Sequence, residues 1–407
     1  MSTLTAEVQT FFSDPRARRD PAAFYRRLVT EEPVTPLGRM WVVAGYDELM
    51  AVATHPATSS DPSVLGTAIP LSPNPVLSAA LSRMLPLRDG ADHRRLKGLA
   101  IRTFSSRGIA QARTLVSETV DALVDANAGQ GSFDVVADLA VPLPVALTCA
   151  LLAIPVEDRG RVLEWAVVLS GQMLGFGVEQ PPDTDRKIDD LLDYINRLCA
   201  DREHQPGPDL LSRLALATRD GQLTHDELVA FVLMLFVNGL ETLTAGLSAA
   251  VWQVLQAPEL LDHIRDHPGD AEAVFDECVR LGSPVRASTR VLLDDIDVGG
   301  RRLRRGAAAI LLFAAANRDP RRFVDPDRLD PRRSERRHLG FGFGPHLCLG
   351  APLSLAAGAT LLDRLARRCR DLRTPLTADT AQWEPSLAFT GLRALPVTFA
   401  AAVPVDA

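Results

Sequence analysis

The sequence predicts a mainly α-helical fold with a minor β-sheet. Apolar residues recur at helical spacing along several long stretches, whereas stretches with strand-like patterning are few and short. No repeat, Gly/Ser linker or low-complexity tract divides the 407 residues, so we expect a single domain over residues 1–407. The expected helices are Arg107–Ala126, Glu157–Leu174, Lys187–Arg202, Asp209–Ala217, Thr224–Gln256, Ala271–Leu281 and Ala351–Arg368, and the expected strands are Met40–Val43, Arg290–Leu293, Ile296–Val298, Ala308–Leu312 and Pro396–Ala400.

The composition excludes several classes of function. The formal net charge is −7 and no long basic block occurs, which argues against nucleic acid as a partner. The 5 cysteines form no CxxC pair, so neither a disulfide framework nor a thiolate zinc site is indicated. Residues 1–20 lack the apolar core of a signal peptide. We therefore expect a cytoplasmic protein.

One apolar stretch, Leu139–Val156, approaches the length of a membrane span. It is broken by Pro142, Pro144 and Pro155, which an uninterrupted spanning helix would have to accommodate. We interpret the stretch as a buried segment and expect no membrane partner.

A long helix is predicted near the middle of the chain. Thr224 and Glu227 have the spacing of a capping box and precede an apolar run. The pattern continues to Gln256, for about 33 residues or about 50 Å of helix. Because the helix is apolar on all sides, it should cross the centre of the molecule.

Polar residues interrupt this helix halfway along its length. Burying Asn238 and Glu241 without partners would cost several kcal/mol, so something must use them. One interpretation is that Glu241 pairs with a buried arginine and that the surrounding stripe is core. The other is that one stripe of the helix faces a cavity; that stripe comprises Phe231, Leu235, Asn238 and Thr242.

A glycine-rich loop, FGFGPHLCLG, precedes the helix that is expected to begin at Ala351. It places Cys348 where a helix N-terminus and backbone N–H groups favour a thiolate, as a nucleophile or metal ligand needs. A lone cysteine is more often a small buried hydrophobic residue. The glycines, however, would let the backbone approach a large flat ligand closely.

This loop resembles the ligand loop of the cytochrome P450 superfamily of haem-thiolate monooxygenases, which has the form FxxGxxxCxG. The matching residues are Phe341, Gly344, Cys348 and Gly350. The likeness is to soluble bacterial, actinobacterial-type members, and it implies the cytochrome P450 fold with the long central helix over the haem.

Three further patterns of the family occur in the expected order. Glu277 and Arg280 match its ExxR helix, and Arg328 resembles the third member of that buried Glu-Arg-Arg cluster. Residues 238–242 resemble the oxygen-activating [AG]Gx[DE]T segment, and residues 315–320 resemble the stretch after the small sheet. The resemblance implies that Glu277, Arg280 and Arg328 have a structural role.

The resemblance also implies a cofactor, haem b, with Cys348 as the proximal ligand of its iron. Phe341 would shield the sulfur, and the N–H groups that follow Cys348, at Gly350 among others, would tune it. The haem propionates would be bound by cationic side chains at family positions. These are His93, Arg290 and His346, with Lys97 where the family usually has arginine. Lys97 cannot form a bidentate fork, so it would be a looser anchor.

Catalysis would then depend on Thr242 and Glu241. The threonine hydroxyl would hydrogen-bond dioxygen, and the carboxylate would help to relay protons from solvent. Asn238 departs from the small residue that is usual at its position. Either it contacts a polar substrate group or the bound oxygen, or it satisfies a local helix carbonyl, and the sequence leaves both interpretations open.

The resemblance implies a medium-sized, mainly apolar organic substrate, which we expect to be an intermediate of secondary metabolism such as antibiotic biosynthesis, either unattached or on a carrier protein. Its covers would be Ser59–Leu87, Leu169–Pro182, Ser283–Thr289 and Leu387–Gly391, and the stretches Ser59–Leu87 and Gly175–Asp185 are expected to be mobile. Candidate pocket residues are Phe231, Leu235, Asn238, Val285 and Phe389, besides Val64, Leu65, Ile69, Leu71, Leu174 and Phe176 in the covers.

Electrons would come from NAD(P)H through separate proteins, a ferredoxin and its reductase. Arginines that flank the motifs could attract an acidic partner. These are Arg94, Arg95, Arg332, Arg333, Arg336 and Arg337.

Three other functions compete with hydroxylation or epoxidation. The same fold could catalyse an atypical oxidation such as ring coupling, desaturation or nitrogen-group chemistry. A haem protein that senses a ligand would need no proton relay, so the presence of Glu241 and Thr242 argues against it. A haem-free cysteine enzyme would need a general base beside Cys348, for which His346 is the nearest candidate in sequence.

Overall fold

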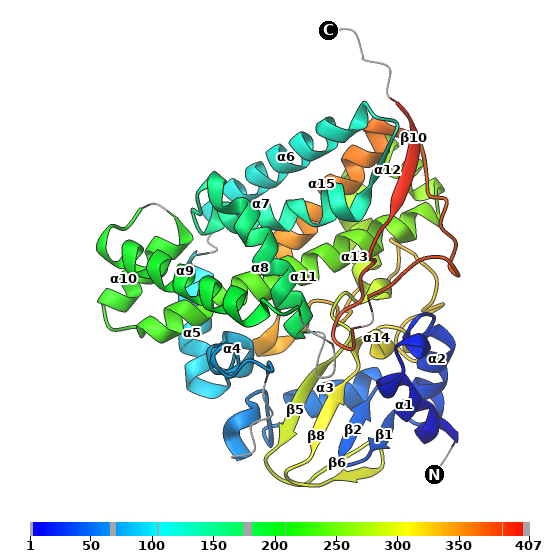
Figure 1. Cartoon of the computed structure of the whole chain (residues 1–407). Coiled ribbons are helices and arrows are strands. Elements are labelled where there is room, and N and C mark those ends of the chain that lie inside the picture. The colour runs from blue at the N-terminus through cyan, green and yellow to red at the C-terminus, as the bar shows by residue number, and fades with distance from the viewer. Residues whose placement is uncertain are drawn as a thin grey trace.

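Helices predominate in the computed structural model of the chain, and the strands gather at one side of the molecule and along its C-terminal edge (Figure 1). The structure describes residues 3–65, 71–103, 106–173, 181–207, 209–384 and 386–401. The predicted class, mainly α with a minor β-sheet, is confirmed. The single-domain interpretation stays a prediction.

The helices of the described residues include each of those expected from the sequence. Their bounds are α1 (Thr3–Ser13), α2 (Ala22–Glu31), α3 (Tyr46–Thr54), α4 (Pro75–Leu81), α5 (Gly90–Thr103), α6 (Ser106–Ala128), α7 (Pro142–Leu151), α8 (Arg159–Met173), α9 (Thr184–His204), α10 (Leu210–Arg219), α11 (His225–Leu255), α12 (Glu259–Asp266), α13 (Ala271–Gly282), α14 (Phe313–Ala316) and α15 (Ala351–Arg368).

The strands form small sheets. A 5-stranded sheet has the order β1-β2-β8-β5-β3, in which β2 and β8 are parallel and the other pairs are antiparallel; a 3-stranded sheet has the order β4-β10-β9, and β6 pairs with β7. The bounds are β1 (Val34–Leu37), β2 (Met40–Val43), β3 (Thr58–Ser59), β4 (Ser132–Asp134), β5 (Ser288–Leu292), β6 (Ile296–Val298), β7 (Arg301–Leu303), β8 (Ala308–Leu311), β9 (Cys369–Arg373) and β10 (Pro396–Ala401).

The long helix α11 lies among α7, α8, α9, α13 and α15, as predicted (Figure 1). Its N-terminus has the expected capping box, in which Thr224 and Glu227 satisfy each other's backbone N–H groups. Arg95 of α5 pairs with Glu227 and so ties α5 to the start of α11. By length and composition α11 could span a membrane, but 67% of its most apolar window is buried inside the protein, as in a core helix.

The proline-containing stretch from Leu139 is also buried. It forms a short π-helix (Val136–Ala140) followed by α7, with Pro142 in the first turn of α7, where proline is tolerated. Leu139 and Leu143 are fully buried.

The predicted cover from Ser59 to Leu87 contains a helix that the sequence analysis did not predict. Within it, α4 has Asn74 as its N-cap and buries Leu77 and Leu81 completely against the core. Ile69, Leu174 and Phe176 lie outside the described residues.

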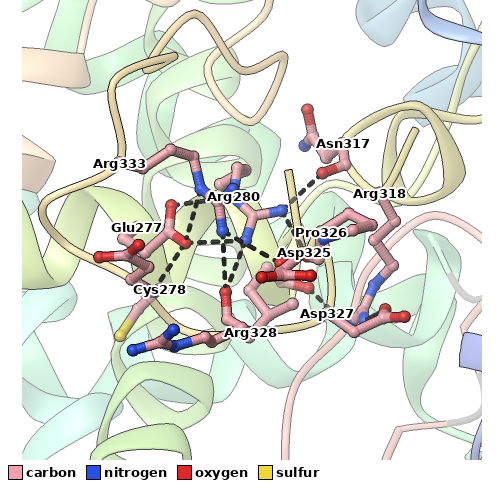
Figure 2. Close-up of polar contacts among 12 residues, drawn as sticks. Glu277, Cys278, Arg280, Asn317, Arg318, Asp325, Pro326, Asp327, Arg328 and Arg333 are labelled. Atoms are coloured by element: carbon pink, nitrogen blue, oxygen red, sulfur yellow. Dashed lines mark hydrogen bonds and ion pairs between the residues drawn. The ribbon is translucent and has the colours of Figure 1, made fainter. Parts of the chain in front are cut away.

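The predicted buried ion cluster on α13 is present, but one of its members differs. Glu277 and Arg280 form a bidentate ion pair, with both N–O distances 2.8 Å. The third member is Arg333, whose Nε lies 3.2 Å from the Glu277 carboxylate (Figure 2). All three side chains are less than 10% exposed.

The assignment of Arg328 to this cluster is therefore wrong. Arg328 contributes its backbone carbonyl, which accepts hydrogen bonds from both Arg280 and Arg333 at 3.2 and 3.0 Å. Its side chain is exposed and points away from Glu277 (Figure 2). A turn in which the Arg328 N–H bonds to the Asp325 carbonyl directs the Arg328 carbonyl inward and brings Arg333 back to the carboxylate.

Arg333→Ala should destabilise the fold by about 3–5 kcal/mol, because it leaves the buried Glu277 charge with an incomplete set of partners. Arg328→Ala, the matched control, keeps the carbonyl that the cluster uses and should cost no more than about 0.5 kcal/mol. Denaturant unfolding followed by circular dichroism measures both. Equal losses in the two variants would contradict the assignment of Arg333.

Candidate functional site

The cysteine loop turns sharply on two glycines. Gly342 and Gly344 have φ of +71° and +58°, a region that side chains other than glycine rarely adopt. A Cβ on Gly342 would also lie 3.0 Å from the His346 carbonyl oxygen. The turn lets the Cys348 N–H bond to the Phe341 carbonyl at 2.9 Å, so Cys348 lies directly before the first turn of α15.

Cys348 has an exposed side chain, whereas the four other cysteines are buried. Burial raises the pKa of Cys149 to about 11, and it raises the pKa values of Cys199 and Cys369 to about 12. These three thiols remain protonated near neutral pH. Of the five cysteines, Cys348 is therefore the one whose side chain is accessible.

Two influences oppose each other at the Cys348 sulfur. Desolvation by the surrounding protein raises its pKa, while the N–H groups of Gly350 and Ala351 and the ammonium group of Lys97 lower it, and the net pKa is raised. The sequence-based expectation of a net lowered pKa is therefore wrong for the unligated thiol. Because a metal ion deprotonates a coordinating thiol, the same N–H groups would then stabilise a thiolate ligand.

Basic side chains from three parts of the chain meet beside this loop. His93 of α5 and His346 of the loop have ring centroids 4.4 Å apart, and both His93 and Arg290 of β5 are less than 10% exposed. Burial and the neighbouring basic groups lower the pKa of His93 to about 4, and burial lowers the pKa of Arg290. Buried basic groups with depressed pKa values indicate a site that an anion would stabilise.

Asp89, which the sequence analysis did not identify, belongs to the same cluster. It lies 3.3 Å from His346 and accepts hydrogen bonds from the Ser59 hydroxyl at 2.6 Å and the Ser60 N–H at 2.7 Å. Burial opposes ionisation, but these hydrogen bonds outweigh it and lower the pKa of Asp89. Its position before α5, four residues from His93, was the signal available in the sequence.

Lys97 of α5 lies beside both His93 and the cysteine loop. Its ammonium group donates hydrogen bonds to the carbonyl oxygens of Pro345 and Leu347, the latter at 3.1 Å. The side chain therefore connects α5 to the cysteine loop, and its role at a haem propionate stays a prediction.

The middle of α11 is less buried than the turns on either side of it. Residues 228–234 and 245–252 are buried, whereas partly exposed residues between them are Leu235, Asn238, Gly239, Glu241, Thr242 and Thr244. The Thr242 hydroxyl donates to the Asn238 carbonyl one turn earlier. Phe231, the other member of the predicted stripe, is 4% exposed and packs in the core.

Two of the predicted covers lie side by side. Val285 and Phe389 form an antiparallel β-bridge, which places their segments next to each other. Both segments pack on α11 one turn beyond Thr242, because a Cβ on Gly391 would lie 3.2 Å from Ala245 and a Cβ on Gly246 would lie 3.3 Å from Pro284. Val285 and Phe389 therefore approach the helix close to its partly exposed stretch.

The arginines proposed as a docking surface divide into two groups. Arg333 is buried in the ion cluster, so assigning it to a docking surface is wrong. The exposed members are Arg94, Arg95, Arg332, Arg336 and Arg337, and Arg95 is paired with Glu227.

Comparison with known proteins identifies the family of this architecture. A family model described as "Cytochrome P450" matches residues 271–378, which include the ion cluster and the cysteine loop. The chain is 32% identical to "Cytochrome P450 monooxygenase PikC" of Streptomyces venezuelae over 93% of its own length and 91% of that protein. It is 33% identical to "Cyclomarin C epoxidase CymV" of Salinispora arenicola, covering 89% of this chain and 91% of the relative.

A solved structure extends the likeness to three dimensions. The structure of P450BioI in complex with an acyl carrier protein ligated to hexadec-9Z-enoic acid superposes with a TM-score of 0.86 at 29% identity. The alignment covers 95% of this chain and 100% of that one.

Proposed function

The chain belongs to the cytochrome P450 family, and from this premise we propose that Cys348 is the proximal ligand of its haem iron. The family's cofactor is a haem with a cysteine thiolate ligand, and the enzyme is a monooxygenase that inserts one oxygen atom from O2 into an organic substrate. The observation that carries the proposal is the exposed Cys348 thiol, with two backbone N–H groups directed at its sulfur.

The residues around Cys348 fit haem b. Haem b carries two propionate carboxylates, so it would require an accessible donor for its iron and basic groups at its edge. Cys348 supplies the donor, and His93, Arg290 and His346 supply basic side chains for the carboxylates. Phe341 packs against the core beside the loop, and Gly350, the N-cap of α15, directs its N–H toward the sulfur.

When bound, the haem would activate dioxygen so that one oxygen atom enters the substrate and the other leaves as water. The side chains that would move protons lie on α11. Thr242 holds a proton at Oγ1, and its present acceptor, the Asn238 carbonyl, keeps that hydroxyl against the helix. Glu241, which is partly exposed, can exchange protons with solvent and supply the threonine.

The substrate that this arrangement favours is a medium-sized, mainly apolar molecule. Leu235, Val285 and Phe389 would contact its apolar surface, and Asn238 would contact a polar group. The names of the two relatives, a monooxygenase and an epoxidase for cyclomarin C, support an intermediate of secondary metabolism. The carrier-protein complex of the structural relative supports a substrate delivered on a carrier.

We further propose that electrons reach the haem from NAD(P)H through a separate ferredoxin and its reductase, in the cytoplasm. The exposed arginines Arg94, Arg95, Arg332, Arg336 and Arg337 form the surface that would attract an acidic ferredoxin.

The carbon monoxide difference spectrum of the reduced protein tests the ligand assignment. The wild-type chain should give the long-wavelength Soret band for which the family is named. Cys348→Ala should abolish that band, whereas Cys199→Ala, which removes a buried thiol elsewhere, should keep it. A band that persists in Cys348→Ala would exclude this residue as the ligand.

Thr242→Ala should release several-fold more hydrogen peroxide per O2 consumed. Without the threonine hydroxyl to guide proton delivery, more of the dioxygen that has taken up two electrons and two protons leaves as hydrogen peroxide before its O–O bond is cleaved. Thr244→Ala is the matched control: its hydroxyl donates to the Ala140 carbonyl at 3.0 Å. Oxygen-electrode and peroxide assays with a surrogate ferredoxin and reductase measure the ratio. Equal ratios in both variants would remove Thr242 from the proton path.

Arg332→Glu should slow reduction by ferredoxin several-fold at low ionic strength and leave reduction by dithionite unchanged. Arg39→Glu, at an exposed turn between β1 and β2, provides the control for net charge. Stopped-flow reduction under carbon monoxide follows both reactions. The docking surface is rejected if ferredoxin reduces both variants at the wild-type rate.

A further inference from the structure

Two arginine side chains are buried beside the apolar cluster that joins α1 and α2 to β2, β8 and α14. Arg286 is 2% exposed and Arg18 is 7% exposed. The cluster consists of aliphatic and aromatic side chains, and α2 contacts α14 on this side of the molecule (Figure 1). Because a guanidinium group does not lose its proton in a protein, both positive charges lie in a region of low dielectric constant.

Among the described residues, no carboxylate pairs with the Arg286 guanidinium. Its hydrogen bond runs from Nη1 to the Tyr25 hydroxyl at 3.1 Å, and its buried Nε–H has no acceptor. The Arg286 Cζ lies 5.8 Å from the centroid of the Phe11 ring, near the limit of a cation–π interaction. A buried charge with such partial compensation is destabilising unless an opposite charge joins it.

Arg18 adds a second positive charge to the same region. Burial and, next in size, the charge of Arg286 lower the pKa of Arg18, while Asp14 opposes this effect. The Arg18 Nη1 donates to the Phe11 carbonyl at 2.7 Å, which is a neutral acceptor. The two guanidinium groups therefore repel each other across a region with little negative charge.

The backbone holds Arg286 in this place. Its N–H donates to the Ala388 carbonyl at 2.7 Å, and its carbonyl accepts the N–H of Ala314 at 3.1 Å. Tyr25 is also buried, and its hydroxyl, which accepts the hydrogen bond from Arg286, still has a proton to donate. Two donors, the Arg286 Nε–H and the Tyr25 O–H, are thus left for a further partner.

We propose that Arg286, Tyr25 and Arg18 form a binding site for a small monovalent inorganic anion, of which chloride is the probe. The Arg286 Nε–H and the Tyr25 O–H would donate to the anion, and Arg18 would supply the second positive charge. The small number of donors and the apolar surroundings disfavour sulfate and phosphate, which would lose more hydration. The bound anion would stabilise the attachment of α1 and α2, independently of the haem ligand.

Urea unfolding of the haem-loaded full chain in sodium chloride and in sodium gluconate, at equal ionic strength, tests the proposal. An anion that binds only the folded chain, at about 100 times its dissociation constant, lowers the unfolding equilibrium constant about 100-fold. The stabilisation by chloride should therefore saturate. Equal stability in the two salts, or an effect that rises without saturation, would overturn the inference.

Three variants locate the effect. Arg286→Met should remove the chloride dependence, and Tyr25→Phe should raise the dissociation constant of chloride about fivefold, as expected for one lost hydrogen bond. Arg19→Met, which removes an exposed charge next to Arg18, is the matched control and should keep the wild-type dependence. The same saturable dependence in Arg286→Met and in the wild type would overturn the assignment.

Bromide in crystals of the wild-type chain gives a readout that does not depend on the folding of a variant. An anomalous peak within hydrogen-bond distance of the Arg286 Nε and the Tyr25 hydroxyl would support the site. Bromide at surface arginines only, or an ordered water between the two donors, would contradict it.

Discussion

The buried ion cluster of Glu277, Arg280 and Arg333 is the constraint on which the position of the cysteine loop depends. Three charges in a dry environment are costly unless every donor and acceptor is used. The donors are used by an irregular segment: Arg280 bonds to the carbonyls of Asn317 and Pro326, and Arg333 bonds to those of Val324, Asp325 and Arg328 (Figure 2). The cluster therefore replaces the secondary structure that this segment lacks.

The constraint extends from this cluster to the sulfur in short steps. The backbone carbonyl of Asn317 accepts a hydrogen bond from Arg280. The side-chain amide oxygen of Asn317 accepts another from the N–H of Leu339, two residues before the loop begins. On its other side the loop is held through His346 to Asp89 and through Lys97 to α5. Fixed at both ends, the loop brings Cys348 to the N-terminus of α15, which packs against α11.

The sequence revealed the long periodic helices and the motif residues better than the contacts between them. For α11 and α15 the predicted bounds agree with the structure within a residue, because the capping box and the apolar pattern are local signals. Short elements such as α4 were missed, since tertiary packing rather than propensity stabilises them. The family resemblance assigned Arg328 to the cluster, but in an irregular segment with several arginines the spacing predicts neither contact nor direction, and Arg333 makes the contact instead. Asp89 was missed because a single carboxylate before a helix is also an ordinary cap.

The structure favours one of the two interpretations of Asn238. One interpretation was that the side-chain amide of Asn238 satisfies a helix carbonyl. The local carbonyl at this position, the backbone carbonyl of Asn238, accepts a hydrogen bond from the Thr242 hydroxyl instead. In the part of the chain that the structure describes, the Asn238 side chain makes no hydrogen bond, although it is partly buried in the middle of α11. Because Asn238 is partly exposed, its amide remains accessible to solvent or to a ligand. It shares the stripe of Leu235 and Thr242, the face where the substrate is proposed to bind, so it could donate to or accept from a polar substrate group within one helical turn of the Thr242 hydroxyl.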